Sequence, residues 1–202
     1  AHQHNRRPMI SSLIQLEKNL HRHAKPIREF GPVQKRAAVA ILLRQADDDV
    51  EMLMIRRATR EGDPWSGHMG FPGGRRDPED RDDLHCAKRE TWEEVGVELD
   101  ECAELICALG EVNTGWRPDR PEILVAPFVF ALRESVVFEL NYEVDEVIWV
   151  PLSFLQDGAH RTTMNWEWQG QQVESDSYLF QDRRIWGLSL MMIDELCAAA
   201  KG

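Results

Sequence analysis

The pattern of apolar and polar positions predicts a mixed chain of strands and helices. Apolar residues recur at helical spacing between positions 9 and 20, which predicts an amphipathic helix, and the stretch 26–32 that follows is typical of a linker. Residues 35–57 contain two apolar runs around an acidic turn, the pattern of a β-hairpin. Later elements are expected as strands at 105–112, 123–131 and 147–150, a short helix at 150–158, a hairpin at 162–180 and a final helix at 185–201.

This order of elements predicts an α/β fold. Strands are mixed with few helices and lack the regular strand-helix-strand alternation of a doubly wound sheet, so an α/β sandwich is favoured. A chain of 202 residues can bury the core of one domain of ordinary size. We therefore expect residues 1–32 to form a helical extension and residues 33–202 to form a single domain.

Composition narrows the classes of partner and compartment. The net charge of -11 disfavours a nucleic-acid partner, because such binding draws its affinity from clustered Lys and Arg. No apolar run approaches the roughly 18 to 20 residues that cross a bilayer, so no membrane partner is expected. The first residues lack the apolar core of a secretory signal, and the last lack a Ser-Lys-Leu address. The four cysteines show neither Cys-x-x-Cys pairs nor zinc spacing, which predicts reduced thiols and a cytoplasmic protein.

The segment FPGGRRDPEDRDDLHCAKRETWEEVG, residues 71–96, contains most of the candidate chemistry. A loop rich in Gly, Pro and Asp leads into an expected helix from about residue 83 to 95, and Gly96 stands where a helix-ending glycine is favoured. Glu90, Glu93 and Glu94 are separated by steps of three and four, so their carboxylates share one side of that helix. We expect this acidic side to be exposed toward the preceding loop, because the opposite stripe suits a core.

Three neighbouring carboxylates have two interpretations. A solvated helix surface tolerates them, since repulsion between like charges at helical spacing costs only a few tenths of a kcal/mol. The alternative is a site for Mg²⁺ or Mn²⁺, hard cations that take carboxylate oxygens and keep waters for bridging to phosphates. Glycine permits close backbone approach, so the Gly74 carbonyl can supply one more metal ligand. By average residue usage the whole string from Arg89 to Gly96 behind Pro-Gly-Gly is rare, which favours the metal site.

The same string resembles the signature of the Nudix hydrolases, G-x5-E-x7-R-E-U-x-E-E-x-G-U with U an apolar residue. Gly74 opens it, and RETWEEVGV closes it at residues 89–97. Asp80 takes the place of the first glutamate and one residue is added before Arg89, as is typical of the coenzyme A diphosphatase branch. Three further segments are similar to that branch: VAPFVF (125–130), EVDEVIWVPLSFL (143–155) and RIWGLSL (184–190). RRATREGDPWSG, upstream of the box, departs from the arginine spacing usual there.

The resemblance implies a Nudix α/β/α sandwich with a central mixed β-sheet, and attack of water on a diphosphate with the help of Mg²⁺ or Mn²⁺. It implies metal ligation by Glu93 and Glu94, and either ligation or deprotonation of the attacking water by Glu90. Arg89 is expected to pair with Asp80 and to fix the loop against the helix, a role in orientation.

Other candidate residues lie outside the box. A distal general base is expected from Glu143 or Glu146, for each of which a solvated strand end is the alternative. His68 can contact a phosphate, and Arg117 and Arg120 can clamp a terminal phosphate, unless they are ordinary loop side chains. The tryptophans that can stack on an adenine, or instead pack in the core, are Trp65, Trp116, Trp166 and Trp168.

The most specific hypothesis is a Mg²⁺-dependent diphosphatase of coenzyme A or acyl-coenzyme A, which yields 4'-phosphopantetheine and adenosine 3',5'-bisphosphate. One alternative is a Nudix diphosphatase of another nucleotide: a nucleotide sugar, a dinucleoside polyphosphate or an oxidised nucleoside triphosphate. The other is a Nudix-fold binding module without activity, which predicts degraded box acids, whereas Arg89, Glu90, Glu93 and Glu94 are all present. The expected partner is a small-molecule nucleotide, and the family also suggests a homodimer.

Overall fold

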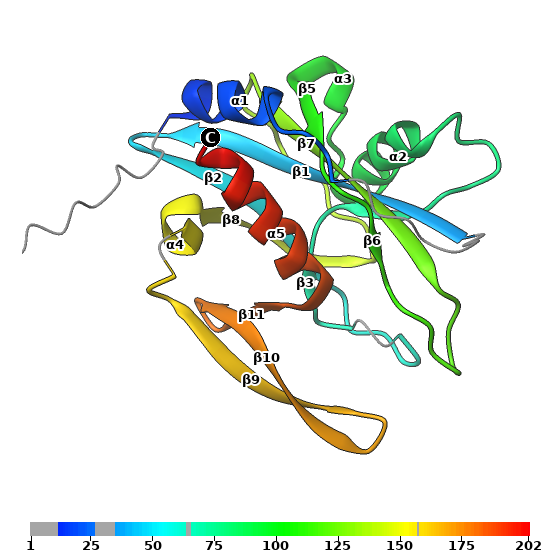
Figure 1. The fold of residues 1–202 in the computed structure, drawn as a ribbon. Coiled ribbons are helices and arrows are strands. Elements are labelled where there is room, and N and C mark those ends of the chain that lie inside the picture. Colours follow the sequence, from blue (N-terminus) through cyan, green and yellow to red (C-terminus); the bar gives the residue numbers. More distant parts are fainter. Residues whose placement is uncertain (1–11, 27–34, 64–65, 157) are drawn as a thin grey trace, which may run out of the picture.

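The computed structural model describes residues 12–26, 35–63, 66–156 and 158–202 (Figure 1). Helices among them are α1 (Leu13–His21), α2 (Asp83–Val95), α3 (Leu99–Cys102), α4 (Leu152–Gln156) and α5 (Gly187–Ala200). Strands are β1 (Lys35–Ala46), β2 (Asp49–Arg57), β3 (Met69–Gly70), β4 (Gly73–Arg75), β5 (Ala103–Ala108), β6 (Val112–Asn113), β7 (Ile123–Leu132), β8 (Val144–Pro151), β9 (Arg161–Trp168), β10 (Gln171–Phe180) and β11 (Arg183–Trp186). The start of the predicted first helix, most of the predicted linker and Trp65 lie outside the described residues.

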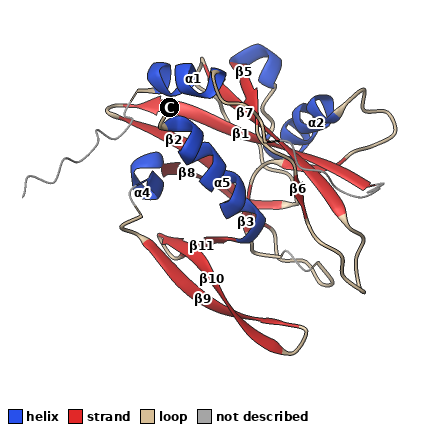
Figure 2. Ribbon diagram, in the orientation of Figure 1, coloured by secondary structure: helices blue, strands red, loops and turns tan. Residues whose placement is uncertain are grey.

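Eight strands form one mixed sheet. Its central order is β3-β2-β1-β7-β5, with β4 paired to β1, β6 to β7 and β8 to β2. Strand β1 runs parallel to β7 and antiparallel to β2 and β4. The predicted hairpin at 35–57 is present, with Ala46 opposite Asp49 across its turn. Helices lie on both sides of this sheet (Figure 2).

The central strands are buried on both faces, which explains their nearly continuous apolar runs. Successive side chains of a strand point to opposite faces. In β2, Met52 and Met54 therefore join the core that contains α1 and α5, while Leu53 and Ile55 join the core beneath α2 and α3. The result is the α/β/α sandwich of the predicted class.

Helix α1 packs against α5. Leu13, Leu16 and Leu20 are buried in the same core as α5, a contribution of about 2 kcal/mol for each fully buried side chain. Asn19 Nδ2 donates a hydrogen bond of 2.7 Å to the carbonyl of Ala200. The first described helix is thus fixed to the last one.

Strands β9, β10 and β11 form a second, antiparallel sheet that projects from the main body (Figure 1). The predicted hairpin at 162–180 is confirmed, with Gln171 opposite Trp168. Its turn residues, Gln169 and Gly170, have φ of 47° and 76°, as a tight two-residue hairpin turn requires. No helix in the described part of the chain is long and apolar enough to span a membrane.

Two predicted elements differ from the structure. The expected strand 105–112 is divided between β5 and β6, because the chain leaves the ladder at Leu109. The final helix begins at Gly187 rather than at 185, because Arg183–Trp186 pairs with β10 as an additional strand. All four cysteines are free thiols, as predicted.

Candidate active site

Helix α2 carries the candidate carboxylates, and its ends are fixed by local contacts. Asp82 Oδ1 accepts a hydrogen bond of 2.7 Å from the His85 N–H and caps the first turn. Gly96 ends the helix with φ of 72°, a left-handed conformation that glycine adopts without steric cost, and its N–H donates to the Trp92 carbonyl. The predicted helix bounds are confirmed.

Glu94 is buried, so the expectation of an exposed acidic side is wrong for this residue. Only 2% of Glu94 is exposed, and its Oε2 accepts a hydrogen bond of 3.2 Å from the Gly73 N–H. Burial raises the pKa of Glu94 to about 8; the Gly73 bond opposes this rise, and the charges of Glu90 and Glu143 add to it. Sequence spacing contained this signal, since Glu94 follows the buried Thr91 by three positions on one helix face.

Glu90 lies beside the turn of the glycine loop. A Cβ atom at Gly74 would come within 2.5 to 2.8 Å of the Glu90 carboxyl atoms, so a glycine at position 74 leaves room for this carboxylate. Burial raises the pKa of Glu90, Arg89 opposes the rise, and the negative charges of Glu93 and Glu143 reinforce it. Glu93 is exposed at the outer edge of the group.

The pairing of β4 with β1 decides which glycine backbone faces the carboxylates. In an antiparallel ladder, successive residues direct their N–H and C=O groups alternately to the partner strand and away from it. The Gly73 N–H donates to Glu94, so the Gly73 groups point away from β1 and toward the carboxylates. Gly74 lies opposite Ala38 in the ladder, and its carbonyl also accepts from Cys86 Sγ at 3.5 Å. The structure therefore favours the carbonyl of Gly73 over that of Gly74, the residue predicted from sequence.

Arg89 fixes the loop to the helix, as predicted. Its Nε and Nη2 donate to the two oxygens of Asp80 at 2.8 and 2.9 Å, and Nη2 also donates to the Arg75 carbonyl at 3.2 Å. Asp80 is 5% exposed, and the Arg89 guanidinium lowers the pKa of its carboxyl to about 2. The bidentate pair therefore connects residue 80 of the loop to residue 89 of α2 through a buried contact.

Replacing Arg89 with Met should lower the free energy of unfolding by about 2 to 3 kcal/mol at pH 7, because the buried Asp80 carboxylate loses its partner. The pKa of Asp80 is lower in the folded than in the unfolded chain, so the pair stabilises fully above pH 4 and loses its effect as pH falls through about 2. Denaturant unfolding of both proteins at pH 7 and pH 3 checks this. The exposed Arg22 beyond α1 gives the control, Arg22→Met, and a loss independent of pH would contradict the assignment.

The donors around α2 fit a hard divalent cation. No three His, Cys, Asp or Glu side chains among the described residues are already arranged as a complete metal-binding group. Arg89 Nη1 instead holds Glu90 and Glu93 at 3.1 Å each. Yet Glu94 and Glu90 are oxygen donors whose raised pKa values reflect burial and mutual repulsion, which a cation between them would relieve.

Stabilisation by Mg²⁺ should increase with pH. The pKa of Glu94 is raised to about 8 by folding, so the protein in EDTA is expected to lose stability as pH rises from about 5 through 8, where the buried carboxyl must ionise. Metal binding needs the ionised form and offsets that cost. Thermal unfolding in EDTA and in Mg²⁺ at pH 6 and pH 9 checks this, with the larger Mg²⁺-induced shift expected at pH 9. Equal shifts at both values would contradict a Mg²⁺ site at Glu94.

Glu143 belongs with the carboxylate group. Its side chain is half-buried, and its negative charge contributes to the raised pKa values of Glu90 and Glu94. The backbone fixes its position, because the Glu143 carbonyl accepts from the Ala58 N–H at 2.8 Å and the Asn141 N–H donates to the Glu94 carbonyl at 3.0 Å. Glu143, the predicted distal residue, therefore lies near α2 although it follows Glu94 by 49 positions in the sequence.

Glu146, the other candidate for the distal base, lies in a separate ion-pair network. Arg183 Nη2 donates to its Oε2 at 2.9 Å, Arg183 Nε donates to its Oε1, and Arg56 Nη2 lies 3.4 Å from Oε1. The hydrogen bonds from Arg183 lower the pKa of Glu146. The structure places this carboxylate between two arginines rather than beside α2.

Strand β2 separates the carboxylates near Glu94 from the ion-pair network of Glu146. Arg56 follows Met54 on the face toward α5, whereas Arg57 follows Leu53 and Ile55 on the face toward α2. Arg57 there lowers the pKa of Glu94 by its charge and donates to Asp63 at 3.0 Å. The sequence analysis did not identify Arg57, although its alternation with Leu53 and Ile55 in the hairpin contained the signal.

The substrate-contact candidates fall into two places. His68 is half-buried near Asp63, Arg57 and Arg120, and burial lowers its pKa. The charges of Arg57 and Arg120 also act on His68 and lower its pKa. Arg117 lies instead over the second sheet, with its guanidinium carbon 4.0 Å from the ring centroid of Trp168.

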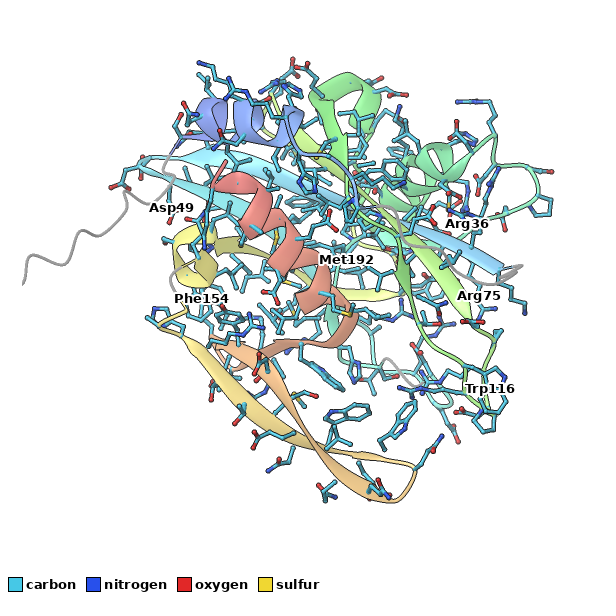
Figure 3. All side chains as sticks on the ribbon, viewed as in Figure 1. Arg36, Asp49, Arg75, Trp116, Phe154 and Met192 are labelled. Atoms are coloured by element: carbon cyan, nitrogen blue, oxygen red, sulfur yellow. The ribbon has the colours of Figure 1, made fainter. Side chains whose placement is uncertain are left out.

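The tryptophan candidates are also divided. Trp116 is 69% exposed on the loop between β6 and β7 (Figure 3). Trp166 and Trp168 are half-buried on β9, in edge contact with each other at a centroid distance of 5.6 Å. Neither of these two rings is part of the hydrophobic cores of the main body.

This fold and this box define the class of the protein. The sequence model of the NUDIX domain matches residues 34–169, and the chain therefore belongs to the NUDIX family. The solved structure of a MutT/nudix family protein from Enterococcus faecalis has the same fold, with a TM-score of 0.51 and 19% identity. That comparison covers 93% of this chain and 74% of the other.

Two curated relatives are named as coenzyme A diphosphatases. The peroxisomal coenzyme A diphosphatase ndx-8 of Caenorhabditis elegans is 30% identical over 157 residues, 76% of this chain and 64% of that protein. The human mitochondrial coenzyme A diphosphatase NUDT8 is 28% identical over 160 residues, 78% of this chain and 66% of that protein. The chain spans 32% to 64% of the length of several curated relatives that it matches.

The comparisons overturn the predicted cytoplasmic location. Besides the peroxisomal and mitochondrial relatives, Nudix hydrolase 15 of Arabidopsis thaliana, 29% identical over 165 residues (77% of this chain and 55% of that protein), is named mitochondrial. The prediction rested on reduced cysteines. Free thiols do not separate the cytoplasm from such compartments, so the cytoplasmic assignment is wrong.

Proposed function

We propose that this chain hydrolyses the diphosphate bond of a nucleoside diphosphate derivative with the help of Mg²⁺. One observation carries the proposal: the Glu94 carboxylate is buried at a glycine backbone, and the negative charges of Glu90 and Glu143 act on it. This arrangement raises the pKa values of Glu94 and Glu90, and it is costly to ionise them unless a divalent cation binds there. Bound Mg²⁺ would neutralise charge on the diphosphate and on the oxygen that leaves.

Each side chain then has a distinct role. Glu94, Glu90 and Glu93 would hold the metal together with the carbonyl of Gly73, and Glu93 and Glu90 would exchange their bonds with Arg89 for bonds to the cation. Arg89, through Asp80, orients α2 against the loop.

Glu143 is the proposed general base for the attacking water. Water adds its oxygen to one phosphorus, the bond from that phosphorus to the bridging oxygen breaks, and the proton of the water passes to the Glu143 carboxylate. Its half-buried position beside the acidic group, with its own backbone held by Ala58, supports this role. The products are two phosphate monoesters.

Coenzyme A or acyl-coenzyme A is the proposed substrate, and 4'-phosphopantetheine and adenosine 3',5'-bisphosphate are the proposed products. Two relatives named for this activity, and Asp80 with its added residue in the box, support the choice. Arg57, whose charge acts on Glu94, and His68 and Arg120 are the proposed cationic and hydrogen-bonding contacts to the diphosphate.

The direct test is an assay of the purified chain with coenzyme A, with and without Mg²⁺, in which both products are identified by mass. Formation of both products only with Mg²⁺ is expected. A panel with a nucleotide sugar, a dinucleoside polyphosphate and an oxidised nucleoside triphosphate is the control for substrate class. Faster turnover of one of these would replace coenzyme A, and no turnover of any would overturn the hydrolase. Light scattering of the same sample measures whether the chain forms the homodimer that the family suggests.

A further inference from the structure

A cavity lined by three arginines lies on the face of β2 opposite the carboxylates. It has a volume of about 190 Å³ and is bounded by residues of β3 and β11. These two strands are in contact where the second sheet meets the main one (Figure 1). Its charged or aromatic lining residues are Arg56, Arg183, Arg184, Asp182, His68 and Trp186. The volume suits a group of a few heavy atoms, and the lining suits an anion.

The arginines of this cavity outnumber the acids beside them, which are Glu146 and Asp182, and the charge of Asp182 acts on Arg183. Arg56 and Arg183 share the single carboxylate of Glu146. No acidic side chain of the described segments forms an ion pair with Arg184, whose Nη1 donates instead to Ser177 Oγ at 2.9 Å. Ser177 is fully buried, so this bond holds the guanidinium in a fixed position toward the cavity. A guanidinium placed in this way matches the oxygens of a phosphate group.

An aromatic row leads away from the same cavity. Trp186 contacts His68 at a centroid distance of 5.9 Å and Trp166 at 5.1 Å, and Trp166 in turn contacts Trp168. These indoles are half-buried and belong to neither hydrophobic core, so packing of the main body does not require them. Aromatic side chains with partly accessible faces stack on nucleobases, at about 1 to 3 kcal/mol for each base.

The position of the cavity relates it to the carboxylates. Arg56 and Arg57 are neighbours in β2, so the cavity and Glu94 lie on opposite faces at the same end of that strand. His68 lines the cavity and is also near Arg57 and Arg120, the proposed diphosphate contacts. A nucleotide whose diphosphate lies at α2 can therefore extend past His68 toward Trp186.

We propose that this cavity binds an additional phosphate monoester on the nucleoside half of the substrate, with Arg184 as the selecting residue and Trp186 beside the base. The assignment of this phosphate to the substrate rests on the proposed function. It defines the substrate class further: a nucleoside diphosphate derivative phosphorylated on its ribose, rather than one with a free ribose.

Binding in EDTA tests the site without any need for turnover. Isothermal titration of the full chain with adenosine 3',5'-bisphosphate and with AMP should give an affinity about 10- to 100-fold higher for the bisphosphate. Arg184→Gln should reduce the bisphosphate to the affinity of AMP and leave AMP unchanged, and Arg184→Lys should restore part of the preference. Arg22→Gln, which removes an exposed charge elsewhere, is the matched control.

Other outcomes overturn the proposal. Equal affinities of the unaltered chain for AMP and the bisphosphate, or an unchanged preference in Arg184→Gln, would exclude a selecting role for this cavity. Loss of the preference in Arg117→Gln instead would assign the phosphate to the loop over Trp168. Tight binding of inorganic phosphate or 4'-phosphopantetheine, with affinities equal to that of the bisphosphate, would define a general anion site.

Turnover separates this proposal from the proposed function. With Mg²⁺, the preference for coenzyme A is the ratio of its kcat/KM to that of the analogue without the 3'-phosphate. This ratio should fall about 10- to 100-fold in Arg184→Gln, with kcat retained. If no nucleotide is hydrolysed, the proposed function fails, whereas the binding experiment still decides whether the cavity selects the phosphate.

Discussion

Replacing Glu94 with Gln is expected to lower kcat by more than about 100-fold at saturating Mg²⁺, since loss of even an outer partner of a metal ligand costs roughly 10- to 100-fold. Stability in EDTA should be unchanged or higher at pH 7. The pKa of Glu94 is raised to about 8 by burial, so the carboxyl is mostly protonated at that pH, and the amide of Gln resembles this neutral form. The Gln carbonyl can also keep the hydrogen bond from the Gly73 N–H.

Initial rates and thermal unfolding with and without Mg²⁺ measure both effects. The variant should lose most of the Mg²⁺-induced increase in unfolding temperature, because that increase reports binding to the native state. Glu101→Gln, on the exposed side of α3, removes the same charge outside the site and is the matched control. Activity close to that of the unaltered chain would refute ligation by Glu94, and a large loss of stability in EDTA would refute the account of its burial.

Replacing Glu143 with Gln is expected to lower kcat/KM by about 100-fold or more, the usual contribution of a general base. The loss should affect the chemical step, so the Mg²⁺-induced increase in unfolding temperature should be retained, because the proposed base is not a ligand of the metal. The fold should persist, because the contacts that position residue 143 are made by its backbone with Ala58 and Asn141.

Glu146→Gln is the matched comparison for this variant. Both residues lie at the start of β8 or just before it, but Glu146 is bound by Arg183 and Arg56 on the other face of β2. Its replacement should leave kcat close to that of the unaltered chain. If the Glu146 variant shows the loss of activity and the Glu143 variant does not, the assignment of the base is reversed, and if neither variant shows it, the base lies elsewhere.

The parts of the fold that follow from local pattern could be predicted. The hairpin of β1 and β2 and the helix ending at Gly96 depend on alternation, helical spacing and a left-handed glycine, all of which are legible within a few residues. Short strands were not predictable in this way. Strands β3, β4 and β11 have four residues or fewer and exist because distant strands offer them partners.

The candidate site was likewise predictable only where its features depend on local sequence. The acids on α2 and the pair of Arg89 with Asp80 follow from spacing within one motif. The burial of Glu94, the orientation of the Gly73 backbone and the nearness of Glu143 depend on how β4 and the start of β8 pack against the helix. Those contacts join segments separated by 20 residues or more, and a pattern along the chain does not encode their geometry.

The alternation at the end of β2 limits how this strand can change in length. The β2–β8 register shifts at Arg56 and Arg57, and the two guanidiniums point to opposite faces. Deleting one residue inside the strand would exchange their sides, so that Arg56, which now lies beside Glu146, would face the carboxylates instead. Libraries with insertions or deletions should therefore yield functional chains when the change falls at exposed Glu61 or Gly62, and not when it falls between Met52 and Arg57.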